Sequence, residues 1–347
     1  MSDFEDINEE LEPGAAGLEL GKVYFMREVD LLTKQEFPYY KIGKVLKDKD
    51  VEKRVKEHQT GNPRSIQTVI EIASKRVTDL ETALHNLNAG VRIHSGEWFW
   101  FPGQSELDAA IAQANQLNAE IEAKSGQVEL AAGLAKTESN GEQKAATSEE
   151  RDIAALLTAN KGASTIVVGL TRNINNELRK RVNDELFAVI GKVTPAFTKV
   201  GFSSTALKAA NPELYAQYQT KPTFSSRFSL ARGLEASELG FNQDDYGFAH
   251  DLDVLAKLSV EELHAEYLRL WALQAGFDWQ VAGLESALRA ATGEYDGING
   301  ITTWKRYNTV QFDSARFKAE QPEAVAQFQK ETAVKESFKV YEWKSYN

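Results

Sequence analysis

The chain has 347 residues, of which 42% are hydrophobic and 26% are charged, so it has enough apolar material for a globular core of two or three domains. Its 40 Lys and Arg residues are outnumbered by 51 Asp and Glu residues, and the net charge of -11 excludes a basic surface over the whole protein. No cysteine is present, which excludes disulfides, thiolate zinc sites and cysteine nucleophiles. A bound metal is therefore expected to be a hard cation such as Mg²⁺ or Mn²⁺.

The N-terminal residues 1–20 contain seven acidic side chains and no basic one, which predicts an acidic flexible arm. This segment lacks the basic start and apolar stretch of a secretory signal. We also find no apolar run near the roughly 18 residues that a membrane span requires. These features predict a cytoplasmic protein with no membrane partner.

Residues 21–103 differ in charge, because 14 Lys and Arg residues outnumber 11 Asp and Glu residues there. β-rich runs alternate with amphipathic helical segments in the order β-β-α-β-α-β. The pattern predicts a small α/β domain with a mixed or antiparallel sheet flanked by helices. The expected strands lie at 22–26, 39–44, 66–73 and 96–101, and the expected helices at 50–58 and 79–87.

The remainder of the chain is predicted to be mostly helical, which gives an α+β fold overall. We expect a helical extension over 104–133 and a flexible linker over 134–150. An internal repeat follows, because residues 202–219 align with 312–329 at an offset of 110. This predicts a duplicated helix-strand-helix module, with copy 1 in 151–228, and long helices plus copy 2 in 229–347.

One set of polar residues in the first domain has the composition of a phosphodiesterase site: Tyr24, Lys44, Arg54, His58 and Glu81. Arg54 and His58 are four residues apart and so share one face of a helix. A Tyr or His can deprotonate a water, an Arg can stabilise the charge on the phosphate, and a Glu can hold one divalent metal. One carboxylate suffices when the metal keeps most of its waters.

These residues resemble the GIY-YIG nuclease superfamily. Its first signature is similar to Lys22-Val23-Tyr24, and its second to Lys41-Ile42-Gly43. The phage-type DNA-binding branch of that superfamily is closer still. Its motifs YKIGK, R..EHQTGNP, E..LH, an Arg and GEWF occur here in that order, between Tyr40 and Phe99.

The resemblance implies a metal-dependent endonuclease acting on DNA, with a residue assignment carried over from these motifs. Lys41 stands where the second signature tyrosine belongs, and of the adjacent Tyr39 and Tyr40 only one can take its place, since they point to opposite faces of a strand. The implied catalytic residues are Tyr24, Tyr40, Lys44, Arg54 and His58, with Glu81 as ligand of Mg²⁺ or Mn²⁺. The implied DNA contacts are Lys41, Lys47, Lys53, Arg64 and Arg92.

Residues 288–347 are similar to the tail of YqaJ-type phage recombination exonucleases, which favours a phage or prophage protein acting in a bacterial host cell. No second catalytic site is implied. Within this region, Trp304-Lys305-Arg306-Tyr307 is an aromatic and basic cluster with two interpretations: contact with nucleic acid, or core packing of Trp304, which is favoured.

Three functions remain open from the sequence. The first is the endonuclease. The second is a non-catalytic DNA-binding protein with the same fold, and the presence of Lys41 in place of the signature tyrosine favours it. The third is an interaction protein whose duplicated module binds a protein partner or forms a homo-oligomer.

Overall fold

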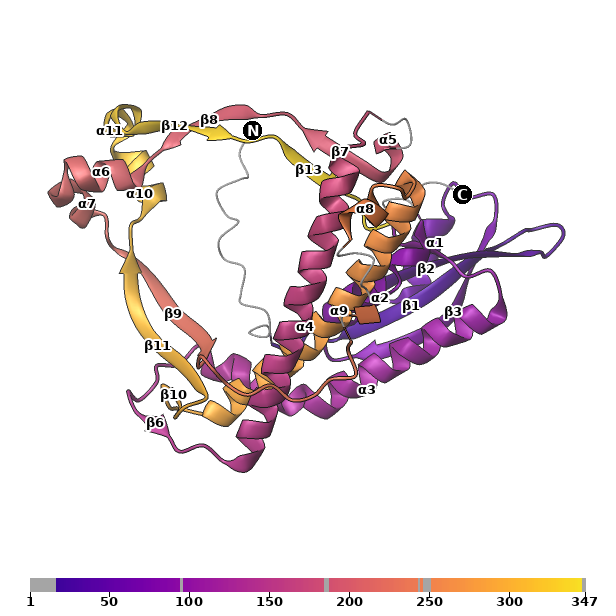
Figure 1. Cartoon of the computed structure of the whole chain (residues 1–347), viewed down its shortest axis with the longest axis horizontal. Coiled ribbons are helices and arrows are strands. Elements are labelled where there is room, and N and C mark those ends of the chain that lie inside the picture. Colours follow the sequence, from indigo (N-terminus) through magenta and orange to yellow (C-terminus); the bar gives the residue numbers. More distant parts are fainter. Residues whose placement is uncertain (1–16, 94–95, 184–186, 243, 246–250, 345–347) are drawn as a thin grey trace.

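The computed structural model describes residues 17–93, 96–183, 187–242, 244–245 and 251–344. Most of the predicted acidic arm, residues 1–16, lies outside these ranges. Helices and mainly antiparallel strands are both abundant, which confirms the expected α+β fold. The chain forms an N-terminal unit around one sheet and a second unit made by the two repeat copies with their long helices, one of which also packs against the N-terminal unit (Figure 1).

The N-terminal unit contains a five-stranded antiparallel sheet in the order β3-β1-β2-β5-β4. Its elements follow the predicted β-β-α-β-α-β order, with a 3-10 turn and a two-residue strand that the sequence did not predict inserted before the last strand. The strands are β1 (Gly21–Val29), β2 (Glu36–Leu46), β3 (Ser65–Ser74), β4 (Arg92–Ile93) and β5 (Trp98–Trp100), and the helices are α1 (Val51–Gln59), α2 (Val77–Leu87), the short 3-10 helix η1 (Ala89–Val91) and α3 (Gln104–Leu134).

Helices cover both faces of this sheet because successive side chains of its strands point to opposite sides. On β1, Val23 and Phe25 pack with α2 and α3, whereas Tyr24 and Met26 pack with Val51 of α1. All four β1 side chains are at most 1% exposed. Burial on both faces fixes the register of β1, because a shift of one residue would exchange the two sets.

The second unit is built around two long helices, α4 (Ser148–Arg179) and α9 (Val260–Thr292), which pack against each other. Each begins with a capping box, at Thr147 with Glu150 and at Ser259 with Glu262. The other helices are α5 (Phe187–Ile190), α6 (Ser204–Ala210), α7 (Pro212–Gln217), α8 (Leu252–Leu255), α10 (Ser314–Glu320) and α11 (Pro322–Gln327). The strands are β6 (Gln143–Lys144), β7 (Gly191–Thr194), β8 (Phe197–Phe202), β9 (Lys221–Leu230), β10 (Gly297–Ile298), β11 (Thr302–Gln311), β12 (Gln329–Val334) and β13 (Ser337–Val340).

The two repeat copies exchange strands with each other. β9 of the first copy pairs with β11 of the second, while β7 and β8 of the first pair with β13 and β12 of the second. Phe228 of β9 pairs with Trp304 of β11, and the repeat matches these positions with 338 and 194. In the structure position 338 pairs with Val193 and position 194 pairs with Ser337, so the equivalent pairing is shifted by one residue. The copies therefore form one pseudo-symmetric unit rather than two successive domains.

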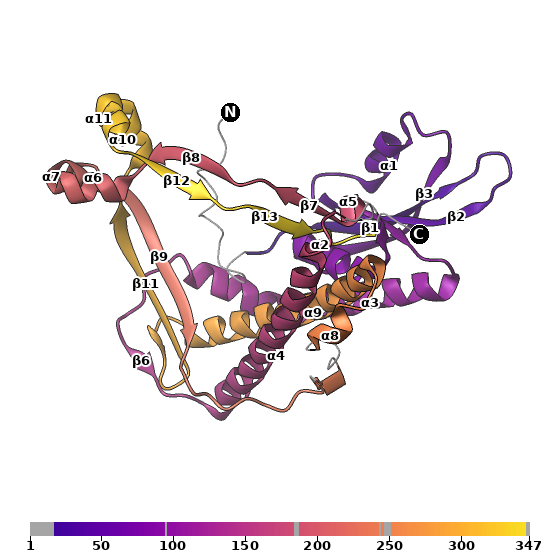
Figure 2. The same cartoon turned by 45° about the horizontal axis from the view of Figure 1, so that its top comes forward.

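The paired strands β9 and β11 form one two-stranded ribbon, and β7 and β8 with β13 and β12 form the other. The two ribbons meet at an apex that carries the helix pairs α6–α7 and α10–α11 (Figures 1 and 2). Residues matched by the repeat pack together there, including Leu207 with Phe317 and Phe202 with Phe312. Leu207 and Phe317 are fully buried. The repeat thus supplies both halves of a small hydrophobic core that neither copy could close alone.

Two expectations from the sequence are corrected. The segment predicted as a flexible linker is bonded into the second unit, with Ser139 donating its amide to Arg306 and β6 pairing with β10. Helix α4 is long and apolar enough to cross a membrane by length and composition, contrary to our reading of the sequence. In the structure α4 packs along α9, and its Lys161 forms an ion pair of 2.6 Å with Glu285 of α9.

Candidate functional site

The candidate site lies where the pairing of β2 with β5 ends. β5 pairs with Tyr39, Tyr40 and Lys41, and the last bond on this side joins the Ile42 amide to the Glu97 carbonyl at 2.9 Å. Among the described residues, no strand pairs with residues 43–46 of β2 on the side away from β1. Side chains from both faces of the sheet therefore approach one another around this open edge.

Gly43 allows Tyr24 to reach this edge. Tyr24 lies opposite Gly43 in the β1–β2 register, and a Cβ at Gly43 would stand 2.5 Å from the Tyr24 hydroxyl oxygen and 2.7 Å from its Cζ. The tyrosine ring thus lies directly on the backbone of β2. Only a residue without a side chain leaves room for it.

Tyr24 connects to α1 through Arg54. Burial raises the pKa of Tyr24, and a hydrogen bond with Arg54 opposes that effect. Arg54 also donates to Glu57 at 2.7 Å, and this bond together with Tyr24 raises the pKa of the guanidinium. Arg54 remains half-exposed, so it is fixed at one end of its guanidinium and open to a ligand.

His58 lies one turn further along α1 and is partly buried. Its Nε2 is buried and has no hydrogen-bond partner among the described residues. Burial and the positive charges of Lys41 and Arg54 lower the pKa of His58. The imidazole is therefore neutral at neutral pH, with a ring nitrogen that no group in the described part of the chain satisfies.

Glu81 approaches the edge from α2, on the opposite face of the sheet. It is 9% exposed, and Lys44 lies 3.0 Å from its carboxylate while also donating to Thr78 at 2.8 Å. Burial raises the pKa of Glu81, although Lys44 counteracts the shift. The carboxylate is thus held in place by α2 and by one lysine.

Glu97 is the residue that sequence reasoning missed as a site residue. Lys41 donates to it at 2.6 Å, and it also acts electrostatically on Tyr24, His58 and Glu81. Burial raises the pKa of Glu97, but the hydrogen bond and charge of Lys41, together with the charges of His85 and Arg54, outweigh burial and leave it lowered. Its signal was the GEWF motif, which places a carboxylate just before β5. We name the group the β2-edge cluster: Tyr24, Lys41, Lys44, Arg54, His58, Glu81 and Glu97.

The other predicted site residues lie apart from this cluster or have structural partners. Tyr40 is 6% exposed in the core, where it packs on Phe101 with ring centroids 5.7 Å apart, so its position does not fit the implied catalytic role. Arg64 binds Glu28 at 2.6 Å and stacks on Phe37. Arg92 donates to the Gly96 carbonyl at 3.0 Å, and burial lowers its pKa.

Three further residues complete this comparison. Lys47 and Lys53 are exposed, and neither forms an ion pair within the described part of the chain. His85 is structural, because its Nε2 donates to the Ile42 carbonyl at 2.9 Å and its ring packs on Phe99. The structure thus brings together five predicted residues and Lys41, which the sequence assigned to DNA contact.

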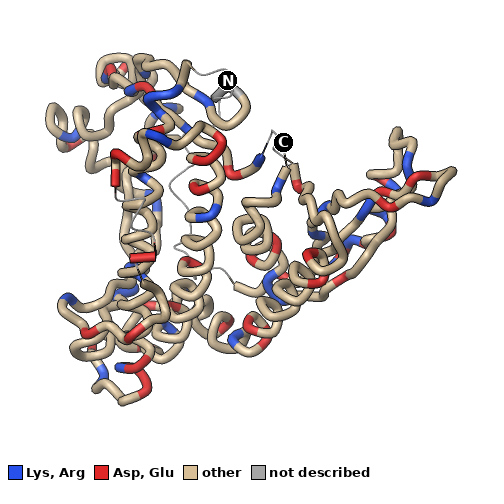
Figure 3. Tube along the Cα trace, turned by 45° about the vertical axis from the view of Figure 1, so that its right-hand side comes forward, with Lys and Arg blue, Asp and Glu red and all other residues tan. Residues whose placement is uncertain are grey.

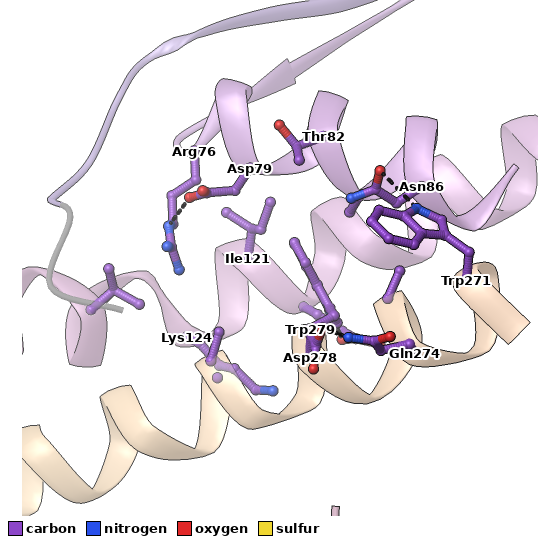
Figure 4. Close-up of a pocket in the computed structure, with 16 residues that line it drawn as sticks. Arg76, Asp79, Thr82, Asn86, Ile121, Lys124, Trp271, Gln274, Asp278 and Trp279 are labelled. Carbon is purple, nitrogen blue, oxygen red and sulfur yellow. Dashed lines mark hydrogen bonds and ion pairs between the residues drawn. The ribbon is translucent and has the colours of Figure 1, made fainter. Parts of the chain in front are cut away.

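A separate cavity of about 270 Å³ lies behind α2, between α2, α3 and α9 (Figure 4). On the α9 side its lining combines the large Trp271 and Trp279 with the small residues Ala275, Ala282 and Gly283, which leave space unfilled. The Trp279 indole donates to Glu120 at 2.9 Å. The cavity borders the face of α2 opposite Glu81. It therefore lies at the interface of α2 and α3 with α9 and is separate from the β2-edge cluster.

No family model, curated protein or solved structure matches this chain. The functional interpretation therefore depends on the chemistry of the β2-edge cluster.

Proposed function

We propose that the N-terminal unit is a metal-dependent endonuclease that hydrolyses DNA phosphodiester bonds, as its resemblance to the GIY-YIG superfamily implies. The observation that carries this proposal is the β2-edge cluster. Helix α1 supplies a half-exposed arginine and a neutral histidine whose Nε2 has no partner among the described residues, and α2 supplies a nearly buried carboxylate. Nuclease chemistry needs these three kinds of group together.

His58 is the proposed general base, because its lowered pKa leaves Nε2 free to accept a proton from a water at neutral pH. Tyr24 suits that role less well, since burial raises its pKa. Tyr24 instead orients Arg54, whose guanidinium donates to the phosphate oxygens as negative charge develops on them. Arg54 is thus the group proposed to stabilise the transition state.

Glu81 is the proposed ligand of Mg²⁺ or Mn²⁺. Among the described residues no group of three His, Asp or Glu side chains gathers to form a complete ligand set. A single carboxylate fits a hard cation that keeps most of its waters, and Glu97 lies close enough to influence the pKa of Glu81. Such a cation would neutralise charge on the phosphate and leaving oxygen.

The test is cleavage of supercoiled plasmid and single-stranded DNA with Mg²⁺, Mn²⁺ or EDTA, using the full chain and its Glu81→Gln variant. The matched control is Glu71→Gln, which removes a carboxylate that pairs with Lys22 at 2.8 Å outside the cluster. We expect metal-dependent nicking that Glu81→Gln reduces at least about 100-fold and Glu71→Gln leaves unchanged. Equal activity of wild type and Glu81→Gln would contradict the proposal.

The second candidate is a DNA-binding protein that has the same fold but does not cleave. The observation in its favour is that both carboxylates of the cluster already form ion pairs with lysines, Glu81 with Lys44 and Glu97 with Lys41. This candidate predicts a shifted band on the same DNA, with no product under any metal and no metal requirement for binding. In either case, we propose that the protein acts inside a bacterial host cell, with the second unit binding DNA, a protein partner or a second copy.

A further inference from the structure

The ribbon of β9 and β11 has one outward face that the proposed active site does not use. Side chains alternate along both strands, so Phe228, Trp304 and Arg306 point inward and are buried. Arg306 donates to the carbonyls of Leu134 and Gly293, and Trp304 donates to Ser226. The cluster Trp304–Tyr307 is therefore divided: Trp304 and Arg306 hold the ribbon, and Lys305 and Tyr307 face outward.

The composition of this ribbon differs from that of the rest of the chain. β9 and β11 contain four Lys and Arg residues and no Asp or Glu in 20 residues. With 51 Asp and Glu in 347 residues, a segment of that length would contain about three on average. Elsewhere acidic and basic residues are interspersed over both units (Figure 3). The ribbon is thus a local basic element on an acidic protein.

The register places two cations directly opposite each other. Arg227 pairs with Lys305 across the two strands, and both side chains are exposed on the outward face. Like charges in directly opposed positions destabilise a sheet, and no carboxylate in the described ranges forms an ion pair with either. Such a pair gains stability when an external anion lies between the two charges.

Hydroxyl groups surround this cation pair. Ser229 and Thr303 share a hydrogen bond of 2.7 Å on one side of it, and Ser225 lies opposite Tyr307 on the other. A shallow depression runs between these six side chains. Arg, Lys, Ser, Thr and Tyr are the side chains that contact phosphate and sugar oxygens of DNA.

We infer that the outward face of the β9–β11 ribbon binds the phosphate backbone of double-stranded DNA. Duplex DNA is the occupant that the geometry favours, because a two-stranded ribbon matches the width of its major groove and its phosphates carry a regular charge. The inward face is anchored on α4 and α9, so the donors are held in place before binding. This inference rests on the proposed function only in taking DNA as the substrate.

The second ribbon of the pseudo-symmetric pair offers an internal comparison. There Lys192 lies opposite Lys339, but Glu342 lies 3.5 Å from Lys339 and compensates one of the charges. On β12, Lys330 is followed at once by Glu331. The uncompensated pair is therefore specific to the β9–β11 ribbon among these strands.

The test measures binding of a labelled duplex of about 30 base pairs by fluorescence anisotropy in EDTA, over a range of salt concentrations. The variant is Arg227→Ser with Lys305→Ser, and the matched control is Lys199→Ser with Lys330→Ser, which removes two exposed lysines from the other ribbon. We expect binding to weaken at least about tenfold in the first variant only. The slope of log affinity against log salt should fall by about 0.9 for each lost phosphate contact.

Wild-type affinity and slope in the Arg227→Ser/Lys305→Ser variant would overturn the inference. An equal loss in the control would also overturn it, since only net charge would then matter. Tighter ribbon-dependent binding of single-stranded DNA or of RNA would exclude the duplex. Cleavage without ribbon dependence would refute this inference alone, whereas ribbon-dependent binding without any cleavage would refute the proposed nuclease alone.

Discussion

Gly43→Ala tests whether the β2-edge cluster depends on the close approach of Tyr24 to β2. The new methyl group would lie 2.5 Å from the Tyr24 hydroxyl and 2.7 Å from its Cζ, whereas ordinary contact begins at about 3.4 Å. The ring must therefore move by about 1 Å. Tyr24 is 1% exposed and packs in one cluster with Val45, Val51 and Ile66, so little space can absorb the shift.

We expect Gly43→Ala to lower the free energy of unfolding by about 1–3 kcal/mol, the range for overpacking a core. Cleavage should fall by about 100-fold, because Tyr24 would carry Arg54 out of position by a similar distance. Urea unfolding followed by tryptophan fluorescence measures the first effect, and plasmid nicking measures the second.

The control is Gly201→Ala on β8, where an added Cβ meets no heavy atom within 4 Å. It should change stability by no more than about 0.5 kcal/mol. The reasoning would be refuted if Gly43→Ala unfolded and cleaved like the wild type. It would also be refuted if Gly201→Ala had the same effect.

Three further predictions concern pH, the buried ion pair and the repeat. The pKa of His58 is lowered from 6.5 in the folded protein, so protonating this histidine opposes folding. Both the free energy of unfolding and the cleavage rate should therefore decline as the pH falls below 6.5. A cleavage rate that does not change with pH in this range, or a pH profile that is the same in His58→Gln, would disprove this. Lys44→Met leaves Glu81 buried without its cation and should cost about 1–3 kcal/mol in urea unfolding, more at about pH 8 than at about pH 5; a pH-independent loss would be inconsistent with the ion pair. Phe317→Ala should lower the free energy of unfolding by about 3–5 kcal/mol through the apex core yet leave plasmid nicking intact at low temperature, and a parallel loss of nicking would show that the apex supports the site.

The local elements of the N-terminal unit could be predicted because their signals are contained in short segments. The β-rich run at 22–26 and the alternating apolar residues at 66–73 correspond to β1 and β3, and the helical spacing at 79–87 corresponds to α2. Arg54 and His58 share a helix face by spacing alone. Tyr40 was misassigned because adjacent residues on a strand face opposite sides, and only packing against Phe101 showed which side is the core.

The second unit shows where such local reasoning ends. The offset of 110 revealed a duplication, and its residues proved to share one core at the apex. It did not reveal that each copy completes its ribbons with strands of the other, because pairing between distant strands depends on contacts that no local pattern encodes. The segment predicted as a linker was misassigned for the same reason, since its polar residues bond to distant backbone groups such as that of Arg306.

The sequence by itself determined the α+β class, the order of elements in the first unit, the existence of a repeat and most members of the candidate site. Tertiary structure alone decided that Glu97 joins Glu81 and His58 at the open edge of β2, and that Arg227 faces Lys305 across a ribbon free of acids. Periodicity reports which face of an element is apolar, and it holds no information on which distant element covers that face. Charges that meet through strand pairing across 78 positions become neighbours only when the chain has folded.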